Sequence, residues 1–346
     1  MRVRHDVPLA PRTTLGVGGS ARQFARAETL DDVREALATA AAANDPVLVL
    51  GGGSNLVIRD RGWDGLVVEI AIPGVRIAAD TNGARVAASA GVVWEDFVAE
   101  MVGAGLAGVE CLSGIPGLVG ATPIQNVGAY GQEVADTIEY VRALDRSTSE
   151  LERIEPGACR FGYRTSAFRA SDRWIVVEVV FRLARSPAAS APIRYPELAR
   201  ALGVADGGTA PLGEVRRCVL DLRRAKGMVV DPADPESRSA GSFFTNPIVD
   251  AATLRTLEAR LGSGVAVPRF AAPGGMTKLA AAWLIEQAGF TKGYTVGRVG
   301  ISRKHALALV NRGGATAREL LDLAEQIQDG VRAKLGIELV PEPVVV

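Results

Sequence analysis

Two glycine-rich segments of the chain have the composition of ligand-binding loops. The first, Gly51-Gly-Gly-Ser-Asn55, directly follows the apolar run Pro46–Leu50, which predicts a short buried strand. Because glycine has no Cβ, such a loop lets backbone N–H groups approach a diphosphate closely, and Ser54 and Asn55 could add side-chain donors. A plain tight turn would account for this segment equally well.

The second segment, residues 114–131, is longer and more irregular. It runs from Gly114-Ile-Pro-Gly-Leu-Val-Gly120 to Gln125-Asn-Val-Gly-Ala-Tyr-Gly131. A loop of this length is uncommon in a compact domain unless it binds something. Its amide side chains and bare backbone suit a flat heterocycle or a phosphate, whereas a surface loop would carry more Ser, Lys and Glu. We therefore favour a ligand cradle over a structural loop.

A third segment, Gly16-Val-Gly-Gly-Ser-Ala21, formally matches the dinucleotide-binding pattern G-x-G-x-x-A. A working site of that kind needs a strand before the pattern and a helix that begins within it. Here Pro11–Leu15 precedes the pattern, and a helix is predicted only from Leu30. A turn or a ligand-facing loop is therefore favoured over a Rossmann site.

The few histidines and cysteines give little support for a metal site, a catalytic triad or disulfides. The two histidines, His5 and His305, lie far apart in the sequence, and Cys111, Cys159 and Cys218 form no C-x-x-C pair. A metal site, a Ser-His-Asp triad and a disulfide framework are therefore not expected, and the cysteines are interpreted as thiols in a reducing compartment.

Composition is that of a globular enzyme rather than of a nucleic-acid-binding or membrane protein. The number of Lys and Arg residues equals that of Asp and Glu, 39 against 39. The chain therefore has no net charge that would attract it to nucleic acid or to a membrane surface. Residues 1–14 lack the apolar core of a signal peptide, and no apolar run approaches the ~20 residues of a membrane span. We expect a cytoplasmic protein with no nucleic-acid or membrane partner.

Hydrophobic periodicity and capping patterns locate the main elements. Thr29-x-x-Asp32 and Thr316-x-x-Glu319 resemble capping boxes at two helix starts. The predicted helices are Leu30–Ala43, Trp94–Val102, Gly213–Ala225, Lys278–Ala288 and Thr316–Leu335. The predicted strands are 46–50, Leu66–Ile70, Arg85–Ala90 and Trp174–Leu183, and the Ala/Ser/Pro-rich segment 184–192 is predicted to be a linker or the edge of an inserted loop.

Taken together, these segments resemble the UDP-N-acetylenolpyruvoylglucosamine reductase family over nearly the whole chain. No single match is specific, but the set in this order is. The matching stretches are Thr13–Gly19, Leu50–Leu56, Gly114–Gly117, Gln125–Gly131, Phe161–Ser166, Ala240–Pro247, Lys278–Ile285 and Pro341–Val344. Leu118 and Ala121 depart mildly from the pattern, because small or Ser/Gly residues are common at those positions.

The resemblance implies an α+β fold: a two-lobe FAD-binding fold of the vanillyl-alcohol-oxidase (PCMH) type, plus a smaller α+β substrate-binding domain. The implied division places the first FAD-binding lobe at 1–75, joined by the C-terminal segment 336–346. The second lobe spans 76–227, with a Tyr-loop insertion near 184–200 typical of the first family type. The substrate-binding domain spans 228–335.

The family's chemistry is the reduction of an enol ether on a UDP-sugar, which needs a hydride source, stabilisation of enolate charge and a proton donor. By resemblance, Arg164 stabilises the enolate, because a guanidinium pairs with a carboxylate at any working pH. Ser242 resembles the proton donor, and Glu342 the third catalytic residue. Without the family, these residues would be interpreted as an ion-pairing arginine, a turn serine and a solvated tail residue.

The resemblance also assigns binding residues. The expected FAD contacts are Gly51, Gly52, Gly53, Ser54, Asn55, Leu56, Gly114, Ile115, Pro116, Gly117, Gly120, Ala121, Gln125, Asn126, Gly128, Ala129 and Tyr130. The expected substrate contacts are Tyr195, Lys226, Asn246 and Gln287. Tyr195 is expected to fold over the nucleotide, and Lys226 to act as a point charge on a phosphate.

The function expected from this resemblance is NADPH-dependent reduction of UDP-N-acetylglucosamine enolpyruvate to UDP-N-acetylmuramate through non-covalently bound FAD, in cytoplasmic peptidoglycan precursor synthesis. A monomer without a metal is expected. Two alternatives stay open from the residues: an oxidase of the same fold that uses O2, and a non-catalytic module that binds a flavin or a UDP-sugar.

Overall fold

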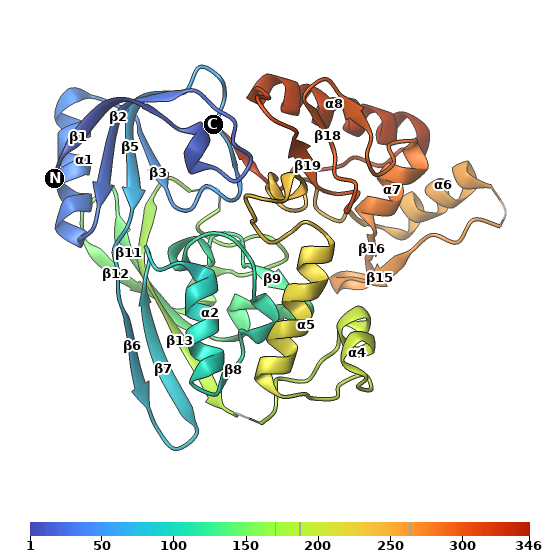
Figure 1. Cartoon of the computed structure of the whole chain (residues 1–346), viewed down its shortest axis with the longest axis horizontal. Helices are drawn as coiled ribbons and strands as arrows, with labels where there is room; N and C mark the ends of the chain where they lie inside the picture. The colour runs from blue at the N-terminus through green and yellow to red at the C-terminus, as the bar shows by residue number, and fades with distance from the viewer. Residues whose placement is uncertain (170, 187, 263) are drawn as a thin grey trace. The chain divides into compact units, whose positions relative to one another are not determined.

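The computed structural model describes residues 1–169, 171–186, 188–262 and 264–346 (Figure 1). Within these ranges the chain divides into two compact units. The first comprises Met1–Val7, Ala21–Gly53 and Trp63–Ala225, and the second comprises Pro8–Ser20, Ser54–Gly62 and Lys226–Val346. The three-part division inferred from the sequence stays a prediction.

The first unit opens with a sheet in the order β1-β2-β5-β3. Its strands are β1 (Val3–Pro8), β2 (Ser20–Ala27), β5 (Trp63–Ile70) and β3 (Val47–Leu50). β2 and β3 both pair with β5 in parallel. Helix α1 (Leu30–Ala43) begins at the predicted capping box of Thr29 and Asp32, and Val33, Ala36 and Ala40 are buried on its inner face.

A larger antiparallel sheet forms the rest of the scaffold of the first unit, in the order β12-β11-β13-β7-β6 with β8 beside β13. Its strands are β6 (Val75–Ala79), β7 (Gly83–Ser89), β8 (Leu106–Ala107), β11 (Ile138–Asp145), β12 (Leu151–Ile154) and β13 (Trp174–Arg185). Trp94 and Phe97 of α2 (Trp94–Gly103) pack with Phe181 of β13, with ring centroids 5.0–6.0 Å apart. This aromatic cluster anchors α2 to the sheet.

The remaining elements of the first unit, within the described ranges, are three helices and a short hairpin. They are α3 (Pro156–Cys159), α4 (Pro196–Leu202), α5 (Leu212–Ala225) and the hairpin of β9 (Gly128–Ala129) with β10 (Gln132–Glu133). α5 lies beside α2 (Figure 1), and an ion pair of 2.6 Å between Arg216 and Glu95 joins the two helices.

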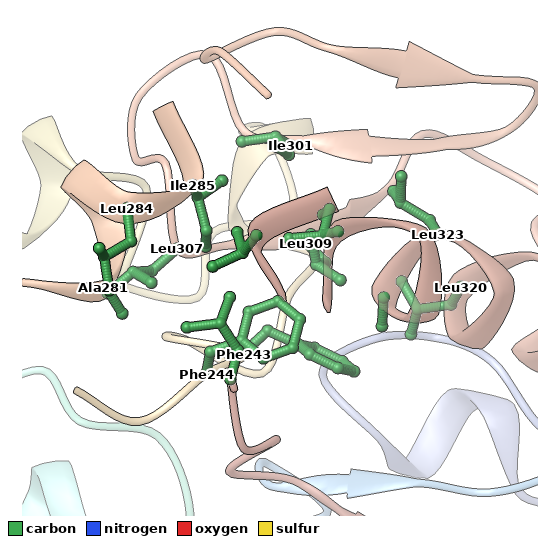
Figure 2. Packing of buried hydrophobic residues seen from close by; sticks show 14 of the residues in the cluster. Phe243, Phe244, Ala281, Leu284, Ile285, Ile301, Leu307, Leu309, Leu320 and Leu323 are labelled. Carbon is green, nitrogen blue, oxygen red and sulfur yellow. The ribbon is translucent and has the colours of Figure 1, made fainter. Parts of the chain in front are cut away.

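The second unit is built from short strands and three helices in the described residues. Its helices are α6 (Ala251–Leu261), α7 (Ala281–Ala288) and α8 (Ala317–Leu335); its strands are β4 (Leu56–Val57), β14 (Ile248–Val249), β15 (Arg269–Ala271), β16 (Thr277–Leu279), β17 (Thr295–Val296), β18 (Val299–Ile301), β19 (Leu309–Asn311) and β20 (Val344–Val345). Phe243 and Phe244 lie at the centre of its core, among apolar side chains of α7, β19 and α8 (Figure 2).

Short 3-10 turns complete the elements: η1 (Ala10–Arg12), η2 (Glu110–Leu112), η3 (Val119–Ala121), η4 (Val134–Asp136), η5 (Pro235–Ser237) and η6 (Pro273–Gly275). In the described part of the chain, every helix is too short or too polar to cross a bilayer.

The predicted helices are present within one or two residues of their expected ends, with one exception. The helix expected from Lys278 begins only at Ala281, because Lys278 is a strand residue of β16 that pairs with Ile248 and Phe270. The four expected strands also form, although β5 begins earlier, at Trp63. Of the segment 184–192, β13 takes residues up to Arg185, and Pro187 lies outside the described residues.

The segment Gly16–Ala21 leads into strand β2 rather than into a helix, so the Rossmann interpretation is excluded as expected. Its glycines permit a close backbone approach instead. A Cβ on Gly19 would lie 2.3 Å from the carbonyl oxygen of Asp60. At Gly19 the backbone of this segment therefore packs directly against the backbone of residues 60–62.

Candidate active site

The loop Gly51–Asn55 follows β3 as expected and meets the second glycine-rich segment inside the first unit. A Cβ added to Gly52 would lie 2.8 Å from the Cα of Gly117, so the two backbones touch without a side chain between them. Gly53 is buried and has a φ of +61°, a conformation that glycine adopts without strain. Only glycine fits this crossing of the two loops.

The amides of this loop fit an anionic cofactor. Across the described residues, no hydrogen bond engages the backbone N–H of Gly52 or of Gly53. Gly53 is buried, and a buried backbone N–H is almost always paired in a folded protein, so its open donor is unusual. The oxygens of a diphosphate would satisfy both amides.

The segment 114–131 is a well-anchored loop. The N–H of Gly114 donates to a carboxylate oxygen of Glu95 at 2.5 Å, and the N–H of Trp94 donates to the carbonyl of Gly117 at 3.0 Å. A Cβ on Gly120 would lie 2.4 Å from the Cβ of Ala90. α2 and Ala90, the residue after β7, therefore hold the first half of this loop close to the scaffold, which agrees with a preformed cradle.

The second half of the loop forms the hairpin of β9 and β10. Tyr130 and Gly131 at its tip both have positive φ, +49° and +84°. This is the backbone pattern of a two-residue type I′ turn, which matches the twist of the flanking strands.

Tyr130 at this tip contacts Tyr195 edge-on. Their ring centroids are 5.3 Å apart with an interplanar angle of 82°. Burial raises the pKa of the Tyr130 hydroxyl to about 12, although the nearby charge of Arg223 lowers it. Tyr195 precedes α4 and keeps 41% of its surface exposed, so its ring has one packed edge and one open face.

Arg223 is a buried cation near Tyr130 that the sequence analysis did not single out. It is 9% exposed, and burial lowers the pKa of its guanidinium, against the raising effect of Tyr130 and Glu95. Its position follows Leu212, Val215 and Val219 on the inner stripe of α5, so the helical period could have indicated that it points inward.

Arg164 sits in a tight turn of the first unit. The N–H of Gly162 donates to the carbonyl of Thr165 at 3.0 Å, and the N–H of Thr165 donates back at 3.2 Å. Within this turn Arg164 has a φ of +53°, and its Nη2 donates to the carbonyl of Gly128 at 2.7 Å. The guanidinium is thus held against hairpin β9–β10, most of which belongs to the glycine-rich segment 114–131.

Ser242 lies in the second unit, between Gly241 and two buried rings. Gly241 has a φ of +72° and open space at its Cβ position. Phe243 and Phe244 are each 1% exposed and anchor the backbone in the core shown in Figure 2. The N–H of Phe243 also donates to the carbonyl of Leu307 at 2.7 Å.

Glu342 lies beside this segment, because the C-terminal strand is pinned on both sides. The N–H of Glu342 donates to the carbonyl of Phe243 at 2.9 Å, and Phe244 pairs with Pro341. On the other side β20 pairs in parallel with β4, and Asn55 Nδ2 donates to the carbonyl of Glu342 at 3.3 Å. The alternative of a frayed, solvated tail is therefore wrong for residues 341–346.

The expected substrate residues of the second unit are spread over several elements. Asn246 Oδ1 accepts the N–H of Ala281 at 2.9 Å and so ties its loop to the start of α7. Gln287 is half-buried on α7, and Lys226 is half-buried directly after α5. The structure thus places Ser242, Glu342, Lys226, Asn246 and Gln287 in the second unit, whereas Arg164 and Tyr195 belong to the first.

Comparisons with known proteins identify both units. Residues 232–346 match the family described as UDP-N-acetylenolpyruvoylglucosamine reductase, C-terminal domain, and residues 21–155 match the FAD binding domain family. The chain is 51% identical over 346 residues to the UDP-N-acetylenolpyruvoylglucosamine reductase of Thermobifida fusca, covering 99% of this chain and 97% of that protein. The like-named protein of Mycolicibacterium smegmatis is 48% identical, covering 99% and 95%.

Solved structures agree. The crystal structure of UDP-N-acetylenolpyruvylglucosamine reductase from Thermus caldophilus matches 100% of this chain and 99% of its own, with a TM-score of 0.67 and 29% identity. The 6-hydroxy-D-nicotine oxidase of Arthrobacter nicotinovorans covers 97% of this chain and 86% of its own, at a TM-score of 0.52 and 16% identity, and so shares the fold alone.

These matches confirm the α+β fold class with its two-lobe FAD-binding architecture and smaller domain, and they confirm FAD as the cofactor. They also confirm an FAD-dependent oxidoreductase rather than a non-catalytic binding module. The chain belongs to the UDP-N-acetylenolpyruvoylglucosamine reductase family.

Proposed function

We propose that the chain reduces the enolpyruvyl group of UDP-N-acetylglucosamine enolpyruvate to give UDP-N-acetylmuramate, with NADPH as the hydride donor, in cytoplasmic peptidoglycan precursor synthesis. The observation that carries this proposal is the hydrogen bond that fixes Glu342 beside the segment of Ser242. A serine hydroxyl and a carboxylate carried by two hydrogen-bonded backbone segments fit a site that must protonate a carbanion. The chemistry that FAD supplies when bound is hydride transfer from NADPH to the methylene carbon of the enolpyruvyl group.

Arg164 would neutralise the carboxylate of the substrate as charge develops on the neighbouring carbon. A guanidinium can pair with both carboxylate oxygens and stays charged at every working pH. Its turn and its bond to Gly128 hold the side chain in one place, so little reorganisation would be needed during the reaction.

Ser242 would then give its proton to the carbon beside the carboxylate, and Glu342 would act through its carboxyl next to the same enolate. An aliphatic hydroxyl is a weak acid, so it needs a charged neighbour and close contact with the substrate. The open space at Gly241 and the buried rings of Phe243 and Phe244 support this interpretation, because they let the loop approach a ligand while its backbone stays fixed.

Binding of the UDP-sugar is assigned to Tyr195, Lys226, Asn246 and Gln287. Tyr195 offers an open ring face for the nucleotide, Lys226 a point charge for a phosphate, and Asn246 and Gln287 amide hydrogen bonds. The FAD contacts expected in residues 51–56 and 114–130 are part of the same proposal, supported by the open amides of Gly52 and Gly53.

The test is an anaerobic double-mixing experiment on the purified yellow protein. NADPH should bleach the flavin, and UDP-N-acetylglucosamine enolpyruvate should then restore the colour with formation of a product two hydrogens heavier by mass spectrometry. Colour that returns only with O2 would favour the oxidase. Acid precipitation should release all flavin to the supernatant, whereas flavin retained in the pellet would contradict non-covalent binding.

The cytoplasmic location and the monomeric state belong to the same proposal. Cell fractionation should find the protein in the soluble cytoplasmic fraction. Size-exclusion chromatography with light scattering should give the mass of one chain, and twice that mass would contradict the monomer.

A further inference from the structure

Arg164 adopts a backbone conformation that needs outside support. Its φ of +53° lies in the left-handed region, which a residue with a long side chain rarely occupies. Such a conformation persists only where surrounding contacts hold it. The turn 162–165 closes on itself through two backbone hydrogen bonds, but these do not attach the turn to the rest of the unit.

One attachment comes from the side chain of Asn126. Its Nδ2 donates to the carbonyl of Gly162 at 3.2 Å, and thus holds the first residue of the turn. The same nitrogen donates to a carboxylate oxygen of Glu133 at 2.7 Å, and Oδ1 accepts the N–H of Ala135 at 3.1 Å.

Together with two further contacts, these bonds form a closed network, the ring, that includes Arg164. The Asn126 side chain bonds to Glu133, and Glu133 is the β-ladder partner of Gly128. The carbonyl of Gly128 accepts the guanidinium of Arg164, whose turn returns to Asn126 through Gly162. Asn126 therefore bonds to the turn of Arg164 at Gly162 and, through Glu133, supports the hairpin that receives its guanidinium; Arg169 Nη1 separately donates to the carbonyl of Arg164 at 2.5 Å.

Asparagine suits this position for physical reasons. Asn126 is 1% exposed and has a φ of +45°, which asparagine tolerates better than most residues. A carboxamide supplies two donors and an acceptor, and here all of them serve the protein. The side chain of Asn126 thus makes three bonds within the protein, and the flavin contact expected at this residue stays a prediction for its backbone.

We propose that Asn126 is a positioning residue that holds the guanidinium of Arg164 where the substrate carboxylate must bind. This inference rests on the proposed function, because it assumes that Arg164 stabilises the enolate. It assigns to Asn126 no direct contact with substrate or cofactor through its side chain.

The test uses Asn126→Asp, which keeps the size and the acceptor of the side chain but removes both donors. Flavin reduction by NADPH and the flavin spectrum should stay as in the parent protein. Reoxidation by the enolpyruvyl substrate should slow by ~10- to 100-fold, since an ångström-scale misplacement of a catalytic group costs about that much. The matched control is Asn44→Asp, the same change at an exposed helix end with a similar φ of +54°; it should alter neither half-reaction.

A double-mutant cycle separates positioning from general damage. In an Arg164→Ala background, Asn126→Asp should slow reoxidation no further, because its effect passes through the guanidinium. A further loss of similar size in that background would overturn the proposal, as would a parent-like rate for Asn126→Asp alone. Failure of the parent protein itself to be reoxidised by the enolpyruvyl substrate would instead contradict the proposed function.

A second variant guards against misfolding. Asn126→Asp places a carboxylate against Glu133, so Asn126→Asp/Glu133→Gln removes that repulsion and lets the introduced amide donate to the introduced carboxylate. The remaining change is at Gly162, whose carbonyl oxygen loses its donor and faces a carboxylate oxygen. Slow reoxidation should persist in this double variant, whereas full recovery would show that the Gly162 bond has no role.

Discussion

The backbone N–H of Glu342 donates a hydrogen bond of 2.9 Å to the carbonyl oxygen of Phe243, the residue that follows Ser242. Because the bond is between backbones, it fixes the register of the two segments whatever the side chain at 342. The N–H of Thr245 donates to the carbonyl of Val340 at 3.0 Å, which adds a second backbone hydrogen bond between the two segments. The side chains of Ser242 and Glu342 can therefore be altered one at a time without loss of this backbone pairing.

Glu342→Gln should leave folding and FAD binding intact, since the side chain is not the link to Phe243. Flavin reduction by NADPH should also be unchanged. Reoxidation by the enolpyruvyl substrate should slow by at least ~10²-fold, the lower range for a placed acid–base group. Stopped-flow absorbance at the flavin band measures each half-reaction. An unchanged reoxidation rate would remove Glu342 from the proposed trio.

Gly52→Ala should weaken FAD binding, because its Cβ would lie 2.8 Å from the Cα of Gly117. Overpacking of this kind typically costs ~1–3 kcal/mol, and ~1.4 kcal/mol corresponds to tenfold in affinity. The flavin-to-protein ratio after dialysis reports the loss. Gly103→Ala is the matched control, because nothing lies within 4 Å of a Cβ at that helical position. Equal flavin retention by both variants would contradict the packing argument.

The parts of the fold predicted from the sequence are those set by local interactions. The capping boxes at Thr29 and Thr316 involve residues three positions apart, so both helix starts were predictable. β16 was missed because its apolar continuation into α7 has a helical period, whereas its strand state depends on pairing with β14 and β15.

The candidate site shows the same limit. Family motifs located Arg164, Ser242 and Glu342, and their catalytic roles stay predictions. The ring that joins Asn126 to Glu133 and to Gly162 could not be predicted, because its members lie up to 36 residues apart and meet only in the folded unit. A motif match indicates which residues matter but not which of them bonds to the protein rather than to a ligand.

Asp145→Asn should change how stability depends on pH. Asp145 is fully buried; hydrogen bonds from Ser147, and then the ion pair with Arg173, lower its pKa from 3.8 to about 2. A carboxyl with a lowered pKa stabilises the fold above pH 3.8, and this contribution is lost as the pH falls towards 2. The variant should therefore unfold more readily at pH 7, and the gap to the parent should close near pH 2. Urea midpoints measured by circular dichroism at several pH values check this, and parallel curves would contradict it.

Tyr195→Ala should weaken binding of the UDP-sugar by about tenfold, the upper range for loss of an aromatic contact. Flavin reduction by NADPH should change little, because the tyrosine is assigned to the nucleotide of the substrate. Tyr195→Phe keeps the ring and its edge contact with Tyr130, so it should retain most of the affinity. Calorimetric titration of the oxidised protein gives the dissociation constants, and equal affinity for all three proteins would contradict the assignment.

Ser242→Ala should separate the two halves of the reaction most sharply. The hydroxyl has no part in flavin reduction, so that half-reaction should keep its rate. Reoxidation by the enolpyruvyl substrate needs a proton on carbon and should slow by ~10²–10⁴-fold, the usual contribution of a placed general acid. The backbone should tolerate the change, because the buried rings of Phe243 and Phe244 anchor the segment. Ser242→Cys should restore part of the rate, since a thiol is a stronger acid of similar size. If alanine slows both half-reactions equally, or neither, then Ser242 is not the proton donor.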